Sequence, residues 1–157
     1  RICLVGSEMC IRDRIYDFVE GSAGDESLRD LNTAALDKMR LMPRVLIDVS
    51  KRSLDLQFLG KDYGLPFGVA PMGMCNLVWP LADQIIAREA ARRRFPVAVS
   101  TASSTTLEKM IELADGFAWF QLYADQSPEF VSDLIERAAS ANYDCLILTV
   151  DLSLIHI

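Results

Sequence analysis

The chain has 157 residues, of which 51% are hydrophobic, and a formal net charge of −6. This length is typical of one domain with a sizeable core, and the acidic balance argues against a nucleic-acid surface, which needs clustered lysine and arginine. No apolar stretch reaches the roughly 18 residues of a membrane span, and the first residues do not read as a secretory signal. The one basic run, residues 92–94, is expected to be a solvated helix end.

Both ends of the chain read as foreign to the rest. Residues 1–14 show no helical or strand period and resemble the translation of a synthetic sequencing adaptor, as do residues 152–157. We expect both to be non-native scars; a natural N-terminal segment and a short strand extension are the alternative. Without these ends, Cys75 and Cys145 remain, too few for a disulfide framework, and Cys145 is expected to be a buried thiol. The single histidine, His156, falls in the tail and is assigned no role.

The region after the first end is expected to form a cover outside the repeated units. Residues 15–39 are predicted to be helical, with an interruption at residues 21–24. Short extended segments are predicted at residues 44–50 and 55–59, and residues 60–62 are predicted to form a turn.

Four apolar, strand-like runs then alternate with helices. The predicted strands are residues 67–72, 97–101, 118–123 and 145–151. Toward their ends the last three carry the polar residues Ser100, Gln121, Tyr123 and Thr149. Because parallel strands joined by helices share one C-terminal edge, we expect these four side chains to converge there. Barrels and doubly wound sheets carry out their chemistry at this edge.

The intervening helices have local signals of their own. The first is predicted over residues 79–94, with Pro80 in its first turn. Its inward stripe is predicted to be Ala82, Ile85, Ile86 and Ala90. The second has capping-box spacing at Thr105 and Glu108. The third is predicted to begin with Ser127 as N-cap and Pro128 as its first residue.

This order of elements fits two architectures, a doubly wound sheet and the first half of an eight-stranded barrel. A doubly wound sheet usually carries a glycine-rich phosphate turn after its first strand. The turn here reads "APMGM" from Ala70, with neither GxGxxG nor a P-loop lysine. The pattern of elements alone leaves both architectures open.

From residue 16 to residue 151 the chain resembles the N-terminal half of the FMN-dependent α-hydroxy acid dehydrogenases and oxidases. Six strings in the same order carry the resemblance: "YDFVEGSAGDE", "PRVLIDVSKRSL", "VAPMGM", "VSTASSTTLE", "WFQLY" and "LTVD". One such string would be weak evidence, whereas six in register are specific. The resemblance implies an α/β (β/α)8 TIM barrel, of which residues 15–151 would supply the N-terminal cover and strands one to four.

The resemblance also assigns residues to an FMN site. The backbone against the flavin N5 edge is matched by Ala70, Pro71, Met72 and Gly73. Further flavin hydrogen-bonding positions are matched by Ser100, Gln121 and Thr149. Proline and glycine suit a close backbone approach to a flat ring, and amide and hydroxyl groups suit a ring with N–H donors and carbonyl acceptors. Without the resemblance, the first segment reads as a tight turn and Gln121 as a satisfied buried polar group.

Tyr123 matches the family's active-site tyrosine, near the hydroxyl or carboxylate of the substrate. A phenol can donate to a developing carbonyl oxygen; the alternative is a tyrosine packed on the core. The implied reaction is oxidation of a small L-2-hydroxy acid to a 2-oxo acid, with electrons passing to flavin N5 and then to a quinone, a cytochrome or O2. The family's catalytic histidine and arginine, its lysine and its phosphate loop would follow Asp151, so the chain alone is expected to be inactive.

Three positions depart from the family pattern. Phe18 stands where the family often has a second substrate-binding tyrosine. Gly73 stands where many dehydrogenases have glycine and many oxidases alanine, which favours a dehydrogenase. Ala102 stands where oxidases of small substrates often have tryptophan, which favours a substrate bulkier than glycolate.

Two other functional classes stay open at this point. One is a different barrel enzyme, and the other is a non-catalytic binding or assembly module. For the whole enzyme, the resemblance implies a homo-oligomer in the cytoplasm, at the periphery of the inner membrane in some members. The acidic charge predicts no nucleic-acid partner, and the residue spacing predicts no metal site.

Overall fold

The computed structural model describes residues 13–123 and 127–150, and it divides into two units, Arg1–Ser53 and Leu54–Ile157. The ends predicted to be foreign, residues 1–14 and 152–157, lie outside the described residues except for Asp13 and Arg14, and their origin stays a prediction. Across the described ranges, no helix has the length and apolar character needed to cross a membrane.

The described part of the first unit, residues 13–53, consists of two helices and an irregular stretch. Helix α1 spans Asp13–Glu20 and helix α2 spans Ser27–Asp37, so the predicted interruption at residues 21–24 is confirmed. The predicted extended segment at residues 44–50 is wrong, because this stretch is irregular and no described residue pairs with it as a strand would require. None of the described residues 15–53 is buried, so this part of the unit has no core of its own.

The second unit begins with a β-hairpin. Strands β1 (Leu56–Phe58) and β2 (Lys61–Tyr63) pair antiparallel through a two-residue turn of Leu59 and Gly60, whose φ angles are 50° and 78°. Two positive φ angles give the turn that matches the twist of a hairpin. The predicted turn at residues 60–62 is therefore wrong for Lys61 and Asp62, which already belong to β2.

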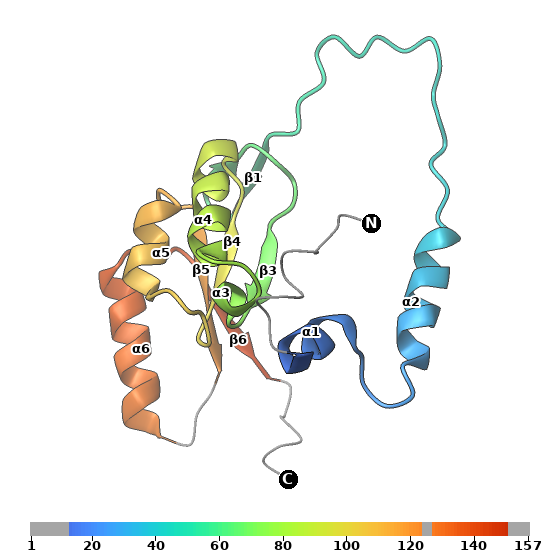
Figure 1. Ribbon diagram of the computed structural model, residues 1–157. Coiled ribbons are helices and arrows are strands. Elements are labelled where there is room, and N and C mark those ends of the chain that lie inside the picture. The colour runs from blue at the N-terminus through green and yellow to red at the C-terminus, as the bar shows by residue number, and fades with distance from the viewer. Residues whose placement is uncertain (1–12, 124–126, 151–157) are drawn as a thin grey trace. The chain divides into compact units, whose positions relative to one another are not determined.

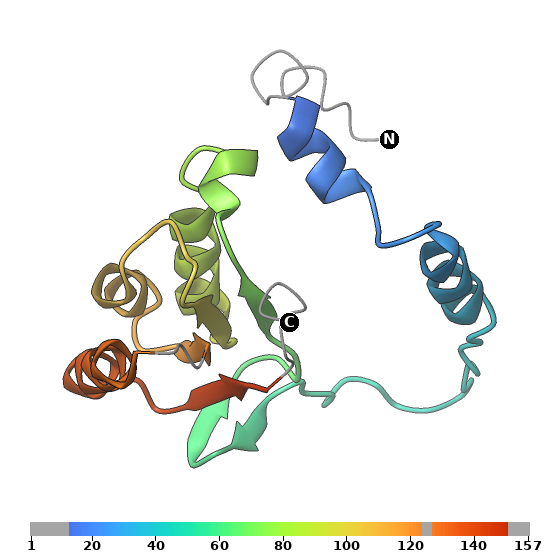
Figure 2. The same cartoon turned by 90° about the horizontal axis from the view of Figure 1, so that it is seen from below.

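A four-stranded parallel sheet forms the body of this unit. Its strands are β3 (Val69–Met72), β4 (Val97–Ser100), β5 (Ala118–Tyr123) and β6 (Leu146–Thr149), in sequential order. The connecting helices α4 (Ala82–Arg93), α5 (Leu107–Leu113) and α6 (Pro128–Ser140) cover one face of the sheet (Figures 1 and 2). Sequential strands with helices on one face are typical of a barrel, since a doubly wound sheet reverses its strand order and carries helices on both faces. The sheet is therefore part of a (β/α)8 barrel.

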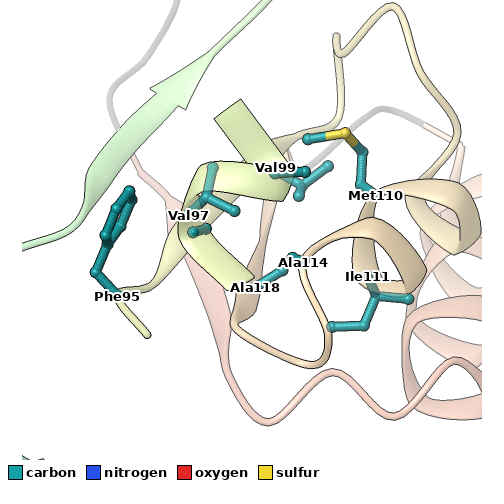
Figure 3. Close-up of a cluster of buried hydrophobic side chains, with 9 residues drawn as sticks. Phe95, Val97, Val99, Met110, Ile111, Ala114 and Ala118 are labelled. Atoms are coloured by element: carbon teal, nitrogen blue, oxygen red, sulfur yellow. The ribbon is translucent and has the colours of Figure 1, made fainter. Parts of the chain in front are cut away.

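Apolar side chains between the sheet and the helices form the core. Val97 and Val99 of β4 belong to one buried cluster with Met110 and Ile111 of α5 (Figure 3). A second cluster joins Phe120 and Leu122 of β5 with Leu107 of α5 and with Leu134 and Ala138 of α6. Side chains alternate along a strand, so the neighbours of these residues face away from the helices. We call that side of the sheet the open face.

Two helices begin later than their sequence pattern indicated. Helix α4 starts at Ala82 rather than residue 79, and Pro80 lies in the turn after an unpredicted short helix, α3 (Cys75–Val78). Thr106, not Thr105, caps α5, with its Oγ1 accepting the Lys109 N–H at 3.4 Å. The third prediction is confirmed, because Ser127 Oγ accepts the Phe130 N–H at 3.3 Å and Pro128 begins α6.

The buried stripe of α4 also differs from the prediction. It consists of Asp83, Ala87 and Ala90, whereas Ile85 is 45% exposed and Ala82 and Ile86 are only partly buried. A hydrophobicity pattern favours isoleucine over aspartate for burial. It cannot foresee that hydrogen bonds from a neighbouring loop will satisfy the aspartate.

The hairpin lies against the N-terminal ends of the strands. Lys61 Nζ donates to the Gly116 carbonyl at 2.6 Å and to Asp144 Oδ2 at 2.7 Å. Trp119 Nε1 donates to the hydroxyl of Tyr63 at 3.1 Å. Because the hairpin occupies this end, a ligand is expected at the opposite one. We call that end, formed by the C-terminal residues of β3–β6 and the loops that follow, the rim.

Candidate active site

The ends of β4, β5 and β6 bring the predicted polar residues together at the rim. Ser100 lies beside Gln121 in the sheet register, and Thr149 lies beside Tyr123. Gln121 Nε2 donates to Thr149 Oγ1 at 2.6 Å. Gln121 and Tyr123 alternate with the helix-facing Phe120 and Leu122, so these polar side chains share the open face.

Gln121 has a buried acceptor that no described residue pairs with. The residue is only 1% exposed, and its Oε1 has no hydrogen-bond partner among the residues that the structure describes. Leaving a buried acceptor without a hydrogen-bond donor costs roughly 1–3 kcal/mol of folding free energy. Such atoms therefore usually accept a hydrogen bond from the protein, from water or from a ligand. The interpretation of Gln121 as a satisfied buried amide holds for its nitrogen only. An N–H donor on a ligand would complete the site.

The two neighbouring hydroxyls complement that acceptor. Ser100 is 5% exposed, and its Oγ accepts the Ala102 N–H at 3.1 Å. Thr149 Oγ1 accepts from Gln121. Since both oxygens act as acceptors in these bonds, each hydroxyl can still donate its proton. One amide acceptor between two hydroxyl donors suits a ring that mixes N–H groups with carbonyl oxygens, as the pyrimidine part of a flavin does.

The end of β3 supplies exposed main chain at the same rim. Val69 pairs with Val97 and Met72 with Val99, so three steps along β3 oppose two along β4 and a bulge results. Bulges are common beside active sites, where they redirect a strand. Ala70, Pro71, Met72 and Gly73 are all exposed. The main chain here is therefore open to close approach by a flat ring.

Gly73 lies against the loop that follows β4. A Cβ added at Gly73 would lie 3.1 Å from Ala102 Cβ, and the Met74 N–H donates to the Ala102 carbonyl at 3.0 Å. The two positions where the chain departs from the oxidase pattern are thus neighbours in space. A larger side chain at either position would press on the other.

Tyr123, the last residue of β5, has a side chain that is 49% exposed. A tyrosine packed on the core would be more deeply buried. The exposed ring at the strand end suits a group that meets a ligand.

Two residues of the rim were missed by sequence reasoning. The carboxylate of Asp83, 4% exposed, accepts the Ser103 hydroxyl and the Ser104 N–H, both at 3.0 Å, and so ties α4 to the loop after β4. Thr101 bonds to the main chain of β5 through its hydroxyl. The only signal for Asp83 was a charge interrupting an apolar helix face, and that for Thr101 was a polar residue at the end of the predicted strand 97–101.

The two cysteines of the described region show no sign of a reactive thiol. Burial, and then the charge of Asp83, raise the pKa of the Cys75 thiol, and burial followed by Asp144 raises that of Cys145. Both thiols therefore stay protonated near neutral pH. Cys145 is partly exposed rather than buried, because it lies just before β6, on which no helix packs after α6 in the described chain.

Asp83→Ala is expected to lower the free energy of unfolding of the complete protein by about 1–3 kcal/mol, because it removes a buried carboxylate that accepts two hydrogen bonds from the loop after β4. Asp83→Asn keeps one acceptor oxygen and should cost less. Denaturant unfolding measures both. Asp133→Ala is the matched control, since its ion pair with Arg137 at 3.5 Å is solvent-exposed and contributes little. Equal losses for Asp83→Ala and Asp133→Ala would show that Asp83 does not anchor the loop.

Comparison with known protein families shows to which family the chain belongs. A family model described as FMN-dependent dehydrogenase matches residues 8–156. The chain belongs to this family. The resemblance noted from its six strings is therefore confirmed, and FMN is the cofactor of the family.

Curated members of the FMN-dependent dehydrogenase family give the same result. The chain is 35% identical over 139 residues to (S)-mandelate dehydrogenase of Pseudomonas putida, covering 88% of the chain and 35% of that protein. It is 34% identical over 155 residues to 2-hydroxyacid oxidase 2 of Bos taurus, covering 96% of the chain and 44% of that protein. The chain thus spans less than half the length of these relatives.

Solved structures of family members share the fold. A soluble mutant of the membrane-associated (S)-mandelate dehydrogenase from Pseudomonas putida matches with a TM-score of 0.83 and 33% identity, covering 94% of the chain and 42% of that structure. A mandelate oxidase mutant solved with a C4a-OH-FMN adduct matches with the same TM-score and 29% identity, covering 94% of the chain and 45% of that structure.

Proposed function

We propose that this chain is the first half of an FMN-dependent enzyme that oxidises an L-2-hydroxy acid to a 2-oxo acid. The relatives named above are a mandelate dehydrogenase and a hydroxyacid oxidase, and L-lactate oxidase of a Nostoc strain is 35% identical over 140 residues. These names share a 2-hydroxy acid substrate and differ in the acid and in the electron acceptor. We therefore assign only the class of reaction, the oxidation of a 2-hydroxy acid.

The proposal rests on Gln121 Oε1, a buried acceptor to which no described residue donates a hydrogen bond. It accepts an N–H of the flavin in this assignment, while the hydroxyls of Ser100 and Thr149 donate to the ring's acceptors. The main chain of the bulge, contributed by Ala70, Pro71, Met72 and Gly73, would hold the reactive edge of the ring. These residues come from all four strands, which explains why the site needs the rim of a barrel.

FMN, when bound, would take up the α-hydrogen of the substrate together with two electrons. Tyr123 donates its phenolic proton in a hydrogen bond to the substrate oxygen that becomes a carbonyl, or to the carboxylate. The base that takes the hydroxyl proton, and the cation that binds the carboxylate, are supplied by the part of the polypeptide that the relatives have beyond this match. We therefore expect the isolated 157-residue chain to be inactive.

Gly73 and Ala102 narrow the proposal. The missing Cβ of Gly73 favours a dehydrogenase that passes electrons to a quinone or a cytochrome rather than to O2. The methyl group of Ala102, which is exposed at the rim, leaves room for a substrate bulkier than glycolate. An aromatic 2-hydroxy acid such as mandelate meets this description. The complete protein is proposed to be a cytoplasmic homo-oligomer that can lie at the inner membrane, as one related enzyme is described as membrane-associated.

FMN binding by the complete protein, obtained by recovering the native gene beyond codon 151, tests the proposal. Gln121→Leu is expected to raise the dissociation constant for FMN about 10- to 100-fold, because it removes a buried acceptor of the ring. Gln57→Leu is the matched control, since Gln57 is exposed on the hairpin at the other end of the sheet. Fluorescence titration of FMN measures all three proteins. A wild-type protein that binds no FMN would overturn the proposal and favour a non-catalytic module.

A further inference from the structure

Thr101 contacts the main chain of β5 on both sides of Leu122. Its Oγ1 donates to the Gln121 carbonyl at 2.7 Å and accepts the Tyr123 N–H at 3.2 Å. Its own N–H donates to the same Gln121 carbonyl at 3.0 Å. One side chain therefore touches the peptide groups of both candidate site residues on β5.

This arrangement replaces a regular ladder bond. In a regular parallel pair the Tyr123 N–H would donate to the main-chain carbonyl of Thr101. Strand β4 ends at Ser100, and the chain turns away into the loop that contacts Asp83. The hydroxyl of Thr101 then accepts this N–H. On the β4 side, the last peptide of β5 is held by one side-chain oxygen, while on its other side the pairing with β6 extends to Tyr123.

We propose that Thr101 is a positioning residue for the active site. By fixing the peptides that flank Leu122, it keeps the Gln121 amide directed at the ring and the Tyr123 phenol directed at the substrate. In this assignment Thr101 itself contacts neither the flavin ring nor the substrate. The inference rests on the proposed function for its catalytic consequence, and its structural part stands on the two hydrogen bonds alone.

Two variants separate this role from simple packing. Thr101→Val keeps the branched shape of the side chain and removes the hydroxyl, whereas Thr101→Ser keeps the hydroxyl and removes a methyl group. In the complete protein loaded with FMN, Thr101→Val is expected to slow reduction of the flavin by (S)-mandelate about tenfold, because it removes both side-chain hydrogen bonds to β5. Thr101→Ser is expected to stay within about twofold of wild type, because its hydroxyl can make both bonds.

Amide hydrogen exchange supplies a readout that does not depend on activity. Exchange at the Tyr123 N–H is expected to be about tenfold faster in Thr101→Val and unchanged in Thr101→Ser, since only valine removes its acceptor. If wild type is not reduced by any 2-hydroxy acid, the proposed function fails and exchange alone decides about Thr101. Unchanged exchange in Thr101→Val, or equal damage by serine and valine, would overturn the inference. Thr101→Ala replaces the valine variant if that variant does not fold.

Discussion

Tyr123→Phe in the complete protein is expected to slow reduction of bound FMN by an L-2-hydroxy acid roughly 10²-fold, because it removes one hydrogen-bond donor to the oxygen on which charge develops. The ring stays, and the half-exposed phenol at the end of β5 has no place in the core clusters, so folding should be unaffected. Anaerobic stopped-flow absorbance of the flavin measures the rate directly.

Tyr143→Phe is the matched control for this experiment. Its phenol donates to the Leu107 carbonyl at 2.7 Å within the helix layer, and burial raises its pKa well above the ordinary value. Loss of that bond should lower stability by about 1 kcal/mol and leave flavin reduction within about twofold of wild type. A Tyr123→Phe rate equal to that of wild type would remove Tyr123 from the reaction.

The isolated 157-residue chain is expected to aggregate and to bind FMN weakly or not at all. On β6, Leu146 is 47% and Leu148 55% exposed, and they lie on the helix-facing side, where no described helix covers them. The described part of the first unit buries no residue. Exposed apolar strands at a sheet edge pair with other chains. Light scattering after size exclusion, with FMN fluorescence, measures both expectations.

A charged variant tests the cause of the aggregation. Leu146→Lys combined with Leu148→Lys should increase the soluble fraction, because lysine at an edge strand opposes pairing with another chain. Leu113→Lys offers a comparison on α5, where the residue packs against the core and substitution should not help. A soluble monomer of the unmodified chain with stoichiometric FMN would contradict the expectation.

The body of the fold could be predicted where local signals were strong. The bounds of β5 agree with the prediction to the residue, and α6 begins where its serine cap and proline indicated. The convergence of Ser100, Gln121 and Thr149 followed from one rule, that parallel strands end at the same edge. A choice between barrel and doubly wound sheet needed the strand order and the placement of the helices, which periodicity does not contain.

The parts that could not be predicted depend on contacts between distant segments. Asp83 is buried because Ser103 and Ser104 donate to it, and Lys61 extends a strand because two residues suffice to turn the hairpin. The hydrogen bonds of Thr101 and the unpaired Gln121 oxygen depend on how β4, β5 and β6 lie side by side. Such hydrogen bonds leave no period in the sequence.

A crystal structure of the complete protein with FMN would examine most directly whether the ends of these strands hold one flavin. We expect Gln121 Oε1 to accept an N–H of the flavin ring, with the hydroxyls of Ser100 and Thr149 bonded to the same ring. A structure in which FMN lies elsewhere, or in which these three side chains bond only to water and to one another, would contradict the assignment.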